Sequence, residues 1–121
     1  MDSFIINGGK RLRGTVEISG SKNAALPIMA ACILVDGEVT LRNVPDLADI
    51  RTMEQLLRKL GLSVERDSTG AMHIRVDDEM NCHAEYDLVR RMRASVCVMG
   101  PLLAKRHMSR VSMPGGCAIG D

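Results

Sequence analysis

The chain has 121 residues, about the length of one domain, and 45% of them are hydrophobic, which supplies enough apolar side chains for a core and excludes a disordered chain. Its formal net charge is +1, so it has no general electrostatic attraction for DNA or RNA. The longest apolar run, Ala24 to Val35, is too short to span a membrane and nothing resembles a signal peptide, so we expect a cytoplasmic protein that binds neither nucleic acid nor membrane.

The first elements predicted along the chain are two strands and a buried helix. Phe4 to Ile6 and Thr15 to Ser19 have the pattern of strands, and Gly20-Ser21 then turns the chain. The segment "KNAALPIMAACILV" that follows is apolar on every side, which is typical of a helix buried all round. If this helix begins near Asn23, Pro27 lies in its first turn, where the amide groups have no partner within the helix to lose.

A strand and the most clearly marked helix come next. Residues 38–44 are predicted to form a strand that the following proline ends. An apolar stripe at steps of three and four then predicts a helix: Leu47, Ile50, Met53, Leu57 and Leu60. Asp46 is expected to cap its start, Glu54 and Arg58 to pair one turn apart, and Gly61 to end it.

A hairpin completes the first unit. Residues 62–66 and 72–76 alternate between apolar and polar positions on either side of the turn sequence "DSTG". Residues 15–76 therefore give the order strand, helix, strand, helix, strand, strand.

A second unit is expected after the polar stretch 77–81. Its helix would run from about Tyr86 to Lys105, with Gly100-Pro101 bending it, and a strand would follow at Arg110 to Met113.

The cysteines indicate free thiols and no metal site. There are four of them: Cys32, Cys82, Cys97 and Cys117. None forms a C-x-x-C pair or stands at metal-ligand spacing from a histidine. Cys32 and Cys97 lie in apolar runs and are expected to be small buried side chains, whereas Cys82 lies in a polar connection.

A lysine and an asparagine stand where a strand is expected to end and the buried helix to begin, in "SGSKNAA". A helix start presents free N–H groups and a partial positive charge that attract phosphate or carboxylate, and Lys22 adds a full charge there. The alternative is an ordinary helix start, with Ser21 or Asn23 as its cap and a solvated lysine. The pattern G-x-x-x-x-G-K-[ST] is absent, so a nucleoside-triphosphate site is not supported.

Three arginines, Arg90, Arg91 and Arg93, lie close together in "YDLVRRMRAS" at the start of the second unit's helix. The helix dipole disfavours cations in a first turn, so the arrangement hints at an anionic partner. Asp87 is placed to pair with Arg91, four residues later. The alternative is that these arginines are solvated surface residues.

The least ordinary stretch is "PGGCAIG". Its proline and glycines disfavour regular structure, so Cys117 is expected on an exposed loop. An accessible thiol beside lysine or arginine can become a thiolate and act as a nucleophile or a proton donor. The alternative is a loop cysteine without a function. His107 is distant in the sequence, so a Cys-His protease arrangement is only weakly supported.

Taken together, the chain resembles the UDP-N-acetylglucosamine 1-carboxyvinyltransferase family over essentially its whole length. The blocks that carry the resemblance are "ISGSKNAALPIMAACIL", "LRNVPDLADI", "LGLSVE", "YDLVRRMRAS" and "PGGCAIG", in that order. The resemblance implies transfer of the enolpyruvyl group of phosphoenolpyruvate to the 3′-hydroxyl of UDP-N-acetylglucosamine, with release of phosphate, in the first committed step of peptidoglycan synthesis. The related shikimate-pathway transferase lacks the "SKNAA" block and the cysteine loop, and is the weaker match.

The resemblance also implies a fold and a missing part. The fold class is α/β, an inside-out α/β barrel of βαβαββ units, with one complete unit and part of a second expected here. Family chains are several times longer, so the chain is expected to be an N-terminal fragment that is inactive alone and lacks the second domain. Residues 1–20 would be a strand segment that associates with that other domain, and residues 21–121 a truncated catalytic domain ending in the cysteine loop.

The functional residues follow from the matching motifs. Lys22 and Asn23 match the pair that contacts phosphoenolpyruvate, and Arg93 matches the arginine that helps to hold the diphosphate of UDP-N-acetylglucosamine. Cys117 matches the cysteine that adds to phosphoenolpyruvate, donates a proton to its methylene carbon and is alkylated by fosfomycin. Lys22 and Cys117 would be catalytic, and no metal or other cofactor is implied. Arg90 and Arg91 match no ligand-binding residue.

Two other hypotheses stay open. The chain could be a non-catalytic module that binds an anion or a nucleotide sugar on the same scaffold. It could also be a different enzyme that uses Cys117 in thiol chemistry, which the lack of a suitably spaced second cysteine or base disfavours.

Overall fold

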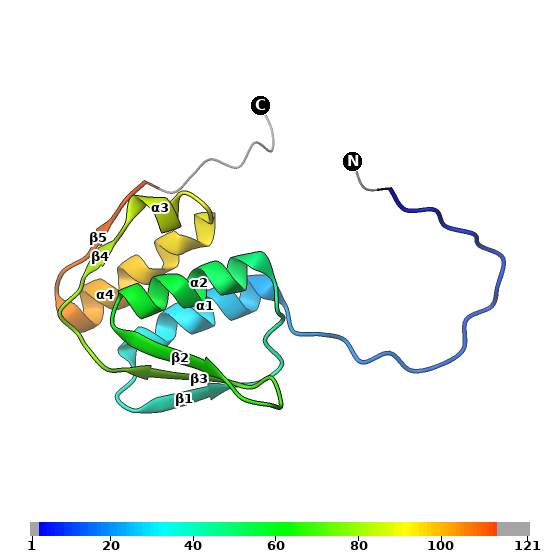
Figure 1. Cartoon of the computed structure of the whole chain (residues 1–121), viewed down its shortest axis with the longest axis horizontal. Coiled ribbons are helices and arrows are strands. Elements are labelled where there is room, and N and C mark those ends of the chain that lie inside the picture. Colours follow the sequence, from blue (N-terminus) through cyan, green and yellow to red (C-terminus); the bar gives the residue numbers. More distant parts are fainter. Residues whose placement is uncertain (1–2, 114–121) are drawn as a thin grey trace.

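A three-stranded antiparallel sheet carries the helices in the computed structural model, which describes residues 3–113 (Figure 1). β1 (Glu38–Leu41) and β2 (Leu62–Arg66) lie on either side of β3 (Met72–Val76). The predicted hairpin is therefore confirmed, and the strand predicted at residues 38–44 is present but shorter.

Asp67 fixes the turn between β2 and β3. Its Oδ1 accepts hydrogen bonds from the backbone N–H of Thr69 at 2.8 Å, from that of Ala71 at 3.0 Å and from the Thr69 hydroxyl at 2.6 Å. The turn sets the register of the hairpin, because a slip of one residue would move every side chain to the other face. In this register the apolar side chains lie under the helices: Leu62, Val64, Met72 and Ile74.

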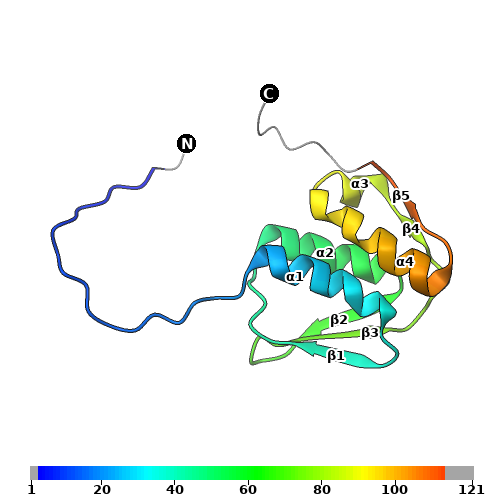
Figure 2. The same ribbon diagram turned by 180° about the vertical axis from the view of Figure 1, so that it is seen from behind.

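Two helices cover one face of this sheet (Figures 1 and 2). α1 (Lys22–Ala31) runs on into a short 3₁₀ helix, η1 (Cys32–Leu34), and packs against α2 (Ala48–Lys59). Most of the stripe predicted for α2 is fully buried in the core: Ile50, Met53, Leu57 and Leu60. Its first member, Leu47, is the N-cap residue and is 46% exposed.

The ends of α2 differ in how well they were predicted. Asp46 does not cap the helix; it instead accepts two hydrogen bonds of 2.7 Å from the guanidinium of Arg51, because the forked donor matches a carboxylate better than a single amide does. The predicted pair of Glu54 and Arg58 is present at 3.7 Å. Gly61 follows the helix with φ of +87°, as predicted.

α1 departs from its prediction in two ways. The helix begins at Lys22, so Pro27 lies in the middle of it and not in its first turn. Pro27 has no N–H, and the carbonyl of Asn23 therefore receives no helical hydrogen bond. The helix is also not buried all round, since Ile28 is 49% exposed and Leu34, in η1, is 44% exposed. Only the side of α1 that faces the sheet, α2 and the second unit is covered.

The second unit contains three short helical pieces where one long helix was predicted. They are α3 (Tyr86–Val89), η2 (Arg93–Val98), a 3₁₀ helix, and α4 (Met99–Arg106). The long-helix prediction is wrong because the chain leaves the helix after α3, and Gly100 and Pro101 start α4 instead of bending it. A proline is tolerated there, since the first amides of a helix have no partner.

A parallel pair of strands closes the second unit. β4 (His83–Ala84) was not predicted, and it pairs with β5 (Arg110–Val111), which lies in the predicted strand 110–113. The guanidinium of Arg106 ties this unit to the first, donating to the carbonyl oxygen of Leu60 at 2.7 Å and to that of Asn81 at 2.6 Å. Within residues 3–113, no helix combines the length and apolarity needed to cross a membrane.

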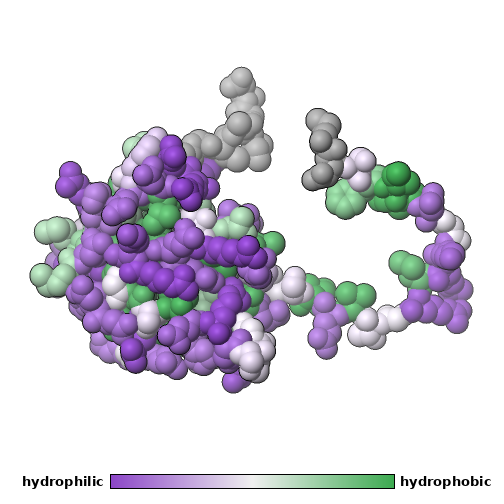
Figure 3. Space-filling view, viewed as in Figure 1, coloured by the Kyte–Doolittle hydropathy of each residue, from purple (hydrophilic) through white to green (hydrophobic). Residues whose placement is uncertain are grey.

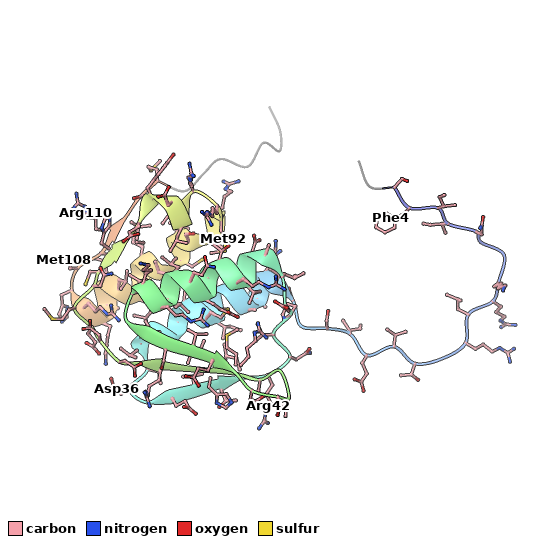
Figure 4. The ribbon with its side chains drawn as sticks, in the orientation of Figure 1. Phe4, Asp36, Arg42, Met92, Met108 and Arg110 are labelled. Atoms are coloured by element: carbon pink, nitrogen blue, oxygen red, sulfur yellow. The ribbon has the colours of Figure 1, made fainter. Side chains whose placement is uncertain are left out.

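Residues 3–19 run away from the packed part of the molecule (Figures 1 and 4). The strands predicted at Phe4 to Ile6 and Thr15 to Ser19 are not formed, because a strand needs a neighbour for its backbone groups and the described residues provide none here. Hydrophobic side chains along the segment stay uncovered (Figure 3). They are Phe4, Ile5, Ile6, Leu12, Val16 and Ile18, each more than 80% exposed.

The sheet face away from the helices is polar, and His73 lies at its centre. The Nε2 atom of His73 is 3.2 Å from Asp67 Oδ2, and Nδ1 is 3.2 Å from Glu38 Oε1. The hydrogen bonds that His73 donates to Asp67 and Glu38 raise its pKa above the ordinary value. Hydrogen bonds from Thr69 and His73 lower the pKa of the Asp67 carboxyl.

We predict that Gly61→Ala destabilises the fold. An added Cβ would lie 2.1 Å from the backbone oxygen of Asp78, in addition to the cost of a positive φ. We expect the free energy of unfolding to fall by about 3 kcal/mol, measured by denaturant titration. Gly70→Ala is the matched control, because its φ is +83° but nothing lies within 4 Å of the added Cβ. Equal losses in the two variants would contradict the steric argument.

We also predict that stability falls as the pH rises past the pKa of His73. Because this pKa is raised by folding, its contribution is complete below the ordinary value of 6.5 and is lost as the pH rises through the folded value. The lowered pKa of Asp67 acts in the opposite sense, and only in acid. The midpoint of thermal unfolding should therefore drop as the pH is raised above 6.5, and His73→Gln should flatten that change. An unchanged profile in the variant would show that the two carboxylates do not stabilise protonated His73.

Candidate functional site

The starting ends of α1 and α2 meet at one side of the helix layer, and each contributes a charged side chain. Lys22 is the first residue of α1, and Asp49 is the second residue of α2. The Nζ atom of Lys22 lies 2.6 Å from Oδ2 of Asp49. The two side chains are 40% and 33% exposed, so the ion pair is open to solvent and to a ligand. Lys22 thus stands at a helix start, where the sequence placed it.

Backbone contacts fix the start of α1. The N–H of Gly20 donates to Oδ1 of Asn43 at 3.1 Å, and Asn43 has a left-handed φ of +57°. A Cβ on Gly20 would lie 1.9 Å from the backbone oxygen of Asn43, so only glycine allows this approach. Ser21 is the N-cap residue, yet its side chain makes no capping hydrogen bond. Capping by the side chain of Ser21, one alternative left by the sequence, is therefore not formed.

A pocket of about 280 Å³ lies between the start of α1 and the end of β1. It is lined by Gly20, Ser21, Ala24, Ala25 and Ile28 on one side and by residues 40–44 on the other. Arg42 provides its only charged lining residue and stands at the end of β1 (Figure 4). Lys22 is not part of the lining, so the pocket is next to the ion pair and separate from it.

Two other predicted ligand-binding residues lie on elements that pack together. Asn23 is an exposed residue in the first turn of α1, and Arg93 is exposed at the start of η2. η2 packs against α1, so the fold brings the two motifs onto adjoining elements. Within residues 3–113, neither side chain makes an ion pair or a hydrogen bond, and both are available to a ligand.

The neighbouring arginines take part in local surface contacts. Arg90 Nε lies 3.5 Å from Asp87 Oδ1, and its guanidinium is 5.7 Å from the ring centre of Tyr86. The predicted pairing of Asp87 with Arg91 is therefore wrong. α3 ends before these arginines, so the four-residue spacing of a continued helix is not kept, and Arg90 is the nearer partner.

Cys117, the predicted reactive thiol, lies outside the described residues. Among the described cysteines, Cys32 is buried, and its thiol donates to the carbonyl oxygen of Ile28 at 3.4 Å. Burial raises the pKa of Cys32, which makes it a poor thiolate, as expected of a core side chain. Cys82 and Cys97 are half-buried. In residues 3–113, no three His, Cys, Asp or Glu side chains gather in a way that could hold a metal ion.

Asp49 is the site residue that the sequence did not reveal. An acidic residue in the first turn of α2 is an ordinary helix feature, which stabilises the dipole. Its pairing with a lysine 27 positions away depends on how the two helices pack. The only local signal was that the motifs of both residues belong to the blocks that carry the family resemblance.

Comparison with known proteins identifies relatives over the whole chain. The family model of EPSP synthase (3-phosphoshikimate 1-carboxyvinyltransferase) matches residues 6–121. The UDP-N-acetylglucosamine 1-carboxyvinyltransferase of Myxococcus xanthus (strain DK1622) is 54% identical over 99% of the chain, and that of Desulfatibacillum aliphaticivorans is 56% identical over the same share. The chain spans 29% of the length of each of these relatives.

The fold is also found among solved structures. The enolpyruvyl transferase NikO from Streptomyces tendae matches 80% of this chain with a TM-score of 0.68 and 24% sequence identity. The match covers 22% of that protein. The predicted fold class, that of the enolpyruvyl transferases, is thereby confirmed.

We predict that Gly20→Ala disturbs the start of α1. The added methyl group cannot be accommodated against the Asn43 backbone, so the hydrogen bond between the two residues must break. The free energy of unfolding should fall by about 1 kcal/mol. Gly8→Ala is the control, because nothing lies within 4 Å of its added Cβ, and it should leave stability unchanged. A Gly20→Ala variant as stable as the unmodified chain would mean that the contact is not maintained in solution.

Proposed function

The chain belongs to the EPSP synthase (3-phosphoshikimate 1-carboxyvinyltransferase) family, and on that premise we propose that it forms part of a UDP-N-acetylglucosamine enolpyruvyl transferase. The reaction would join the enolpyruvyl group of phosphoenolpyruvate to the 3′-hydroxyl of the sugar and release phosphate. Its place would be the cytoplasm, in peptidoglycan synthesis. The names of the relatives at 52–56% identity support the nucleotide sugar, and not shikimate 3-phosphate, as the acceptor.

The observation that carries the proposal is the solvent-accessible side chain of Lys22 at the start of α1. The first turn of α1 contains no acidic residue, so its free N–H groups keep their attraction for an anion. Phosphoenolpyruvate carries a phosphate and a carboxylate, and Lys22 would neutralise part of that charge. Asn23, one position later and exposed, would add an amide donor.

Arg93 and Cys117 would act on the other parts of the reaction. The exposed guanidinium of Arg93 would hold the diphosphate of UDP-N-acetylglucosamine, since its fork can donate two parallel hydrogen bonds to phosphate oxygens. Cys117 would protonate the methylene carbon of phosphoenolpyruvate, which makes the adjacent carbon electrophilic. The sugar hydroxyl then adds to that carbon and loses its proton. The tetrahedral adduct expels phosphate as its new methyl group gives up a proton, which restores the carbon–carbon double bond of the enolpyruvyl group. The same thiol would open the epoxide of fosfomycin.

We assign the remaining catalytic groups to the part of the relatives' sequences that this chain does not span. The sugar hydroxyl must lose a proton as it attacks, so a base has to stand opposite the proton donor. We assign that base to a carboxylate in the second domain. The chain as given would accordingly bind ligands without turning them over, because acid and base must face each other across one closed cleft.

The test is phosphate release from phosphoenolpyruvate in the presence of UDP-N-acetylglucosamine, measured on the protein at the full length its gene encodes. Cys117→Ala should lower kcat by at least about 100-fold, because it removes the general acid. Lys22→Ala should raise the KM for phosphoenolpyruvate, and Arg93→Ala that for the nucleotide sugar. Arg91→Ala is the control and should behave as the unmodified enzyme. Shikimate 3-phosphate used in preference to the nucleotide sugar, or full activity of Cys117→Ala, would overturn the proposal.

A further inference from the structure

We propose that Asp49 is the positioning residue for Lys22. Its carboxylate holds the ammonium by one hydrogen bond, so that the other two N–H groups of Lys22 face an incoming anion. The identity of that anion, phosphoenolpyruvate, rests on the proposed function. The role of Asp49 itself follows from the contacts of the two side chains.

The geometry is that of a strong and exclusive pair. Nζ to Oδ2 is 2.6 Å, within the range of charge-assisted hydrogen bonds. Among residues 3–113, Lys22 and Asp49 have no other hydrogen-bond or ion-pair partner through their side chains. By comparison, the carboxylate of Asp46 binds Arg51. The carboxylate of Asp67 binds Thr69, Ala71 and His73. Apart from its favourable place in the first turn of α2, Asp49 therefore interacts through its side chain with Lys22 alone among these residues.

The position of the pair explains how the hydrogen bond from Lys22 to Asp49 favours ligand binding. Lysine has a long flexible stem, and ordering it on binding a ligand costs entropy. Asp49 comes from a different helix, whose start is held next to that of α1 by the buried core, so it fixes the ammonium relative to both helix starts. The Lys22 side chain is then already ordered when the protein folds, before a ligand binds.

The carboxylate of Asp49 also has an effect that opposes anion binding. A carboxylate next to an ammonium repels a second anion, and it could compete with phosphoenolpyruvate for Lys22. An ammonium has three N–H donors, however, and Asp49 uses one of them. With 40% of its surface exposed, part of the Lys22 side chain stays accessible to a ligand. Both charges are also partly solvated, which screens the repulsion more than it weakens the short hydrogen bond. Positioning therefore outweighs competition.

The experiment compares Asp49→Ala and Asp49→Asn at the full length that the gene encodes. The dissociation constant of phosphoenolpyruvate is measured by titration, and the KM and kcat by phosphate release. Asp49→Ala should weaken binding of phosphoenolpyruvate about tenfold, with the KM for the nucleotide sugar unchanged. Asp49→Asn keeps an oxygen acceptor for Lys22 and should recover most of the affinity. Tighter binding by Asp49→Ala would establish competition and overturn the proposal.

Asp46→Ala is the matched control. It removes the same charge close to the start of α2, but from a carboxylate that binds Arg51 and not Lys22. It should leave the affinity for phosphoenolpyruvate unchanged. A loss equal to that of Asp49→Ala would show a general effect of charge and would also overturn the proposal. Thermal unfolding of each variant reveals any loss of folded protein, which would lower the apparent kcat and leave both KM values unchanged.

A double-mutant cycle separates failure of this inference from failure of the proposed function. In a Lys22→Ala background, Asp49→Ala should have no further effect on binding, because Asp49 then has no ammonium to position. Additive losses would overturn the positioning role. If Lys22→Ala weakens binding and Asp49→Ala does not, this inference alone fails. If the unmodified protein does not bind phosphoenolpyruvate, the proposed function fails, and the same cycle is run with inorganic phosphate, followed through the NMR signals of the backbone amides at the start of α1.

Discussion

The packing of α1 beside α2 on one face of the β1-β3-β2 sheet is the constraint on which the site depends. Both helices turn their apolar sides to the sheet, and close packing among Met29, Ile50, Met53 and their neighbours holds the pair in this arrangement. In that arrangement the two helix starts are adjacent (Figures 1 and 2). A lysine in one first turn and an aspartate in the other then meet at hydrogen-bond distance. The site is thus a consequence of the core and not of a local loop.

Prediction from the sequence succeeded where a segment's own pattern determines its structure. The α2 stripe and the "DSTG" turn are local signals, and both elements formed as expected. It failed where the outcome depends on neighbours. The alternation at Thr15 to Ser19 is a true strand pattern, but no described strand lies beside it. The segment after Tyr86 is apolar enough for one helix, and contacts with α1 and α2 break it into three pieces. Asp46 had two local options, and pairing with Arg51 proved the stronger.

The candidate site divides along the same line. Lys22 could be placed at a helix start from "SGSKNAA" alone, since a glycine, a serine and an apolar run mark such a start. The exposure of Lys22 and Arg93 could not be predicted from the sequence, because it depends on which faces of α1 and η2 the rest of the fold covers. Asp49 could not be linked to Lys22 at all, since nothing in a single sequence connects positions 27 residues apart. Contacts between residues far apart in the sequence are therefore the part of this site that the sequence alone does not predict.

The two faces of this layered structure also differ in a way that bears on its fold. Charged and polar side chains cover the outer face of the sheet, with His73 bound between Glu38 and Asp67. The exposed apolar side chains of the packed part lie instead mainly on the helix side, for example Ile28 and Leu103, each 49% exposed. In most layered α/β proteins a sheet is buried between helices, whereas here the sheet faces water and the helices present an apolar surface. That polarity fits the inside-out α/β barrel expected for the enolpyruvyl-transferase fold. The ion pair of Lys22 and Asp49 stands at one end of this helix layer, where the starts of α1 and α2 meet.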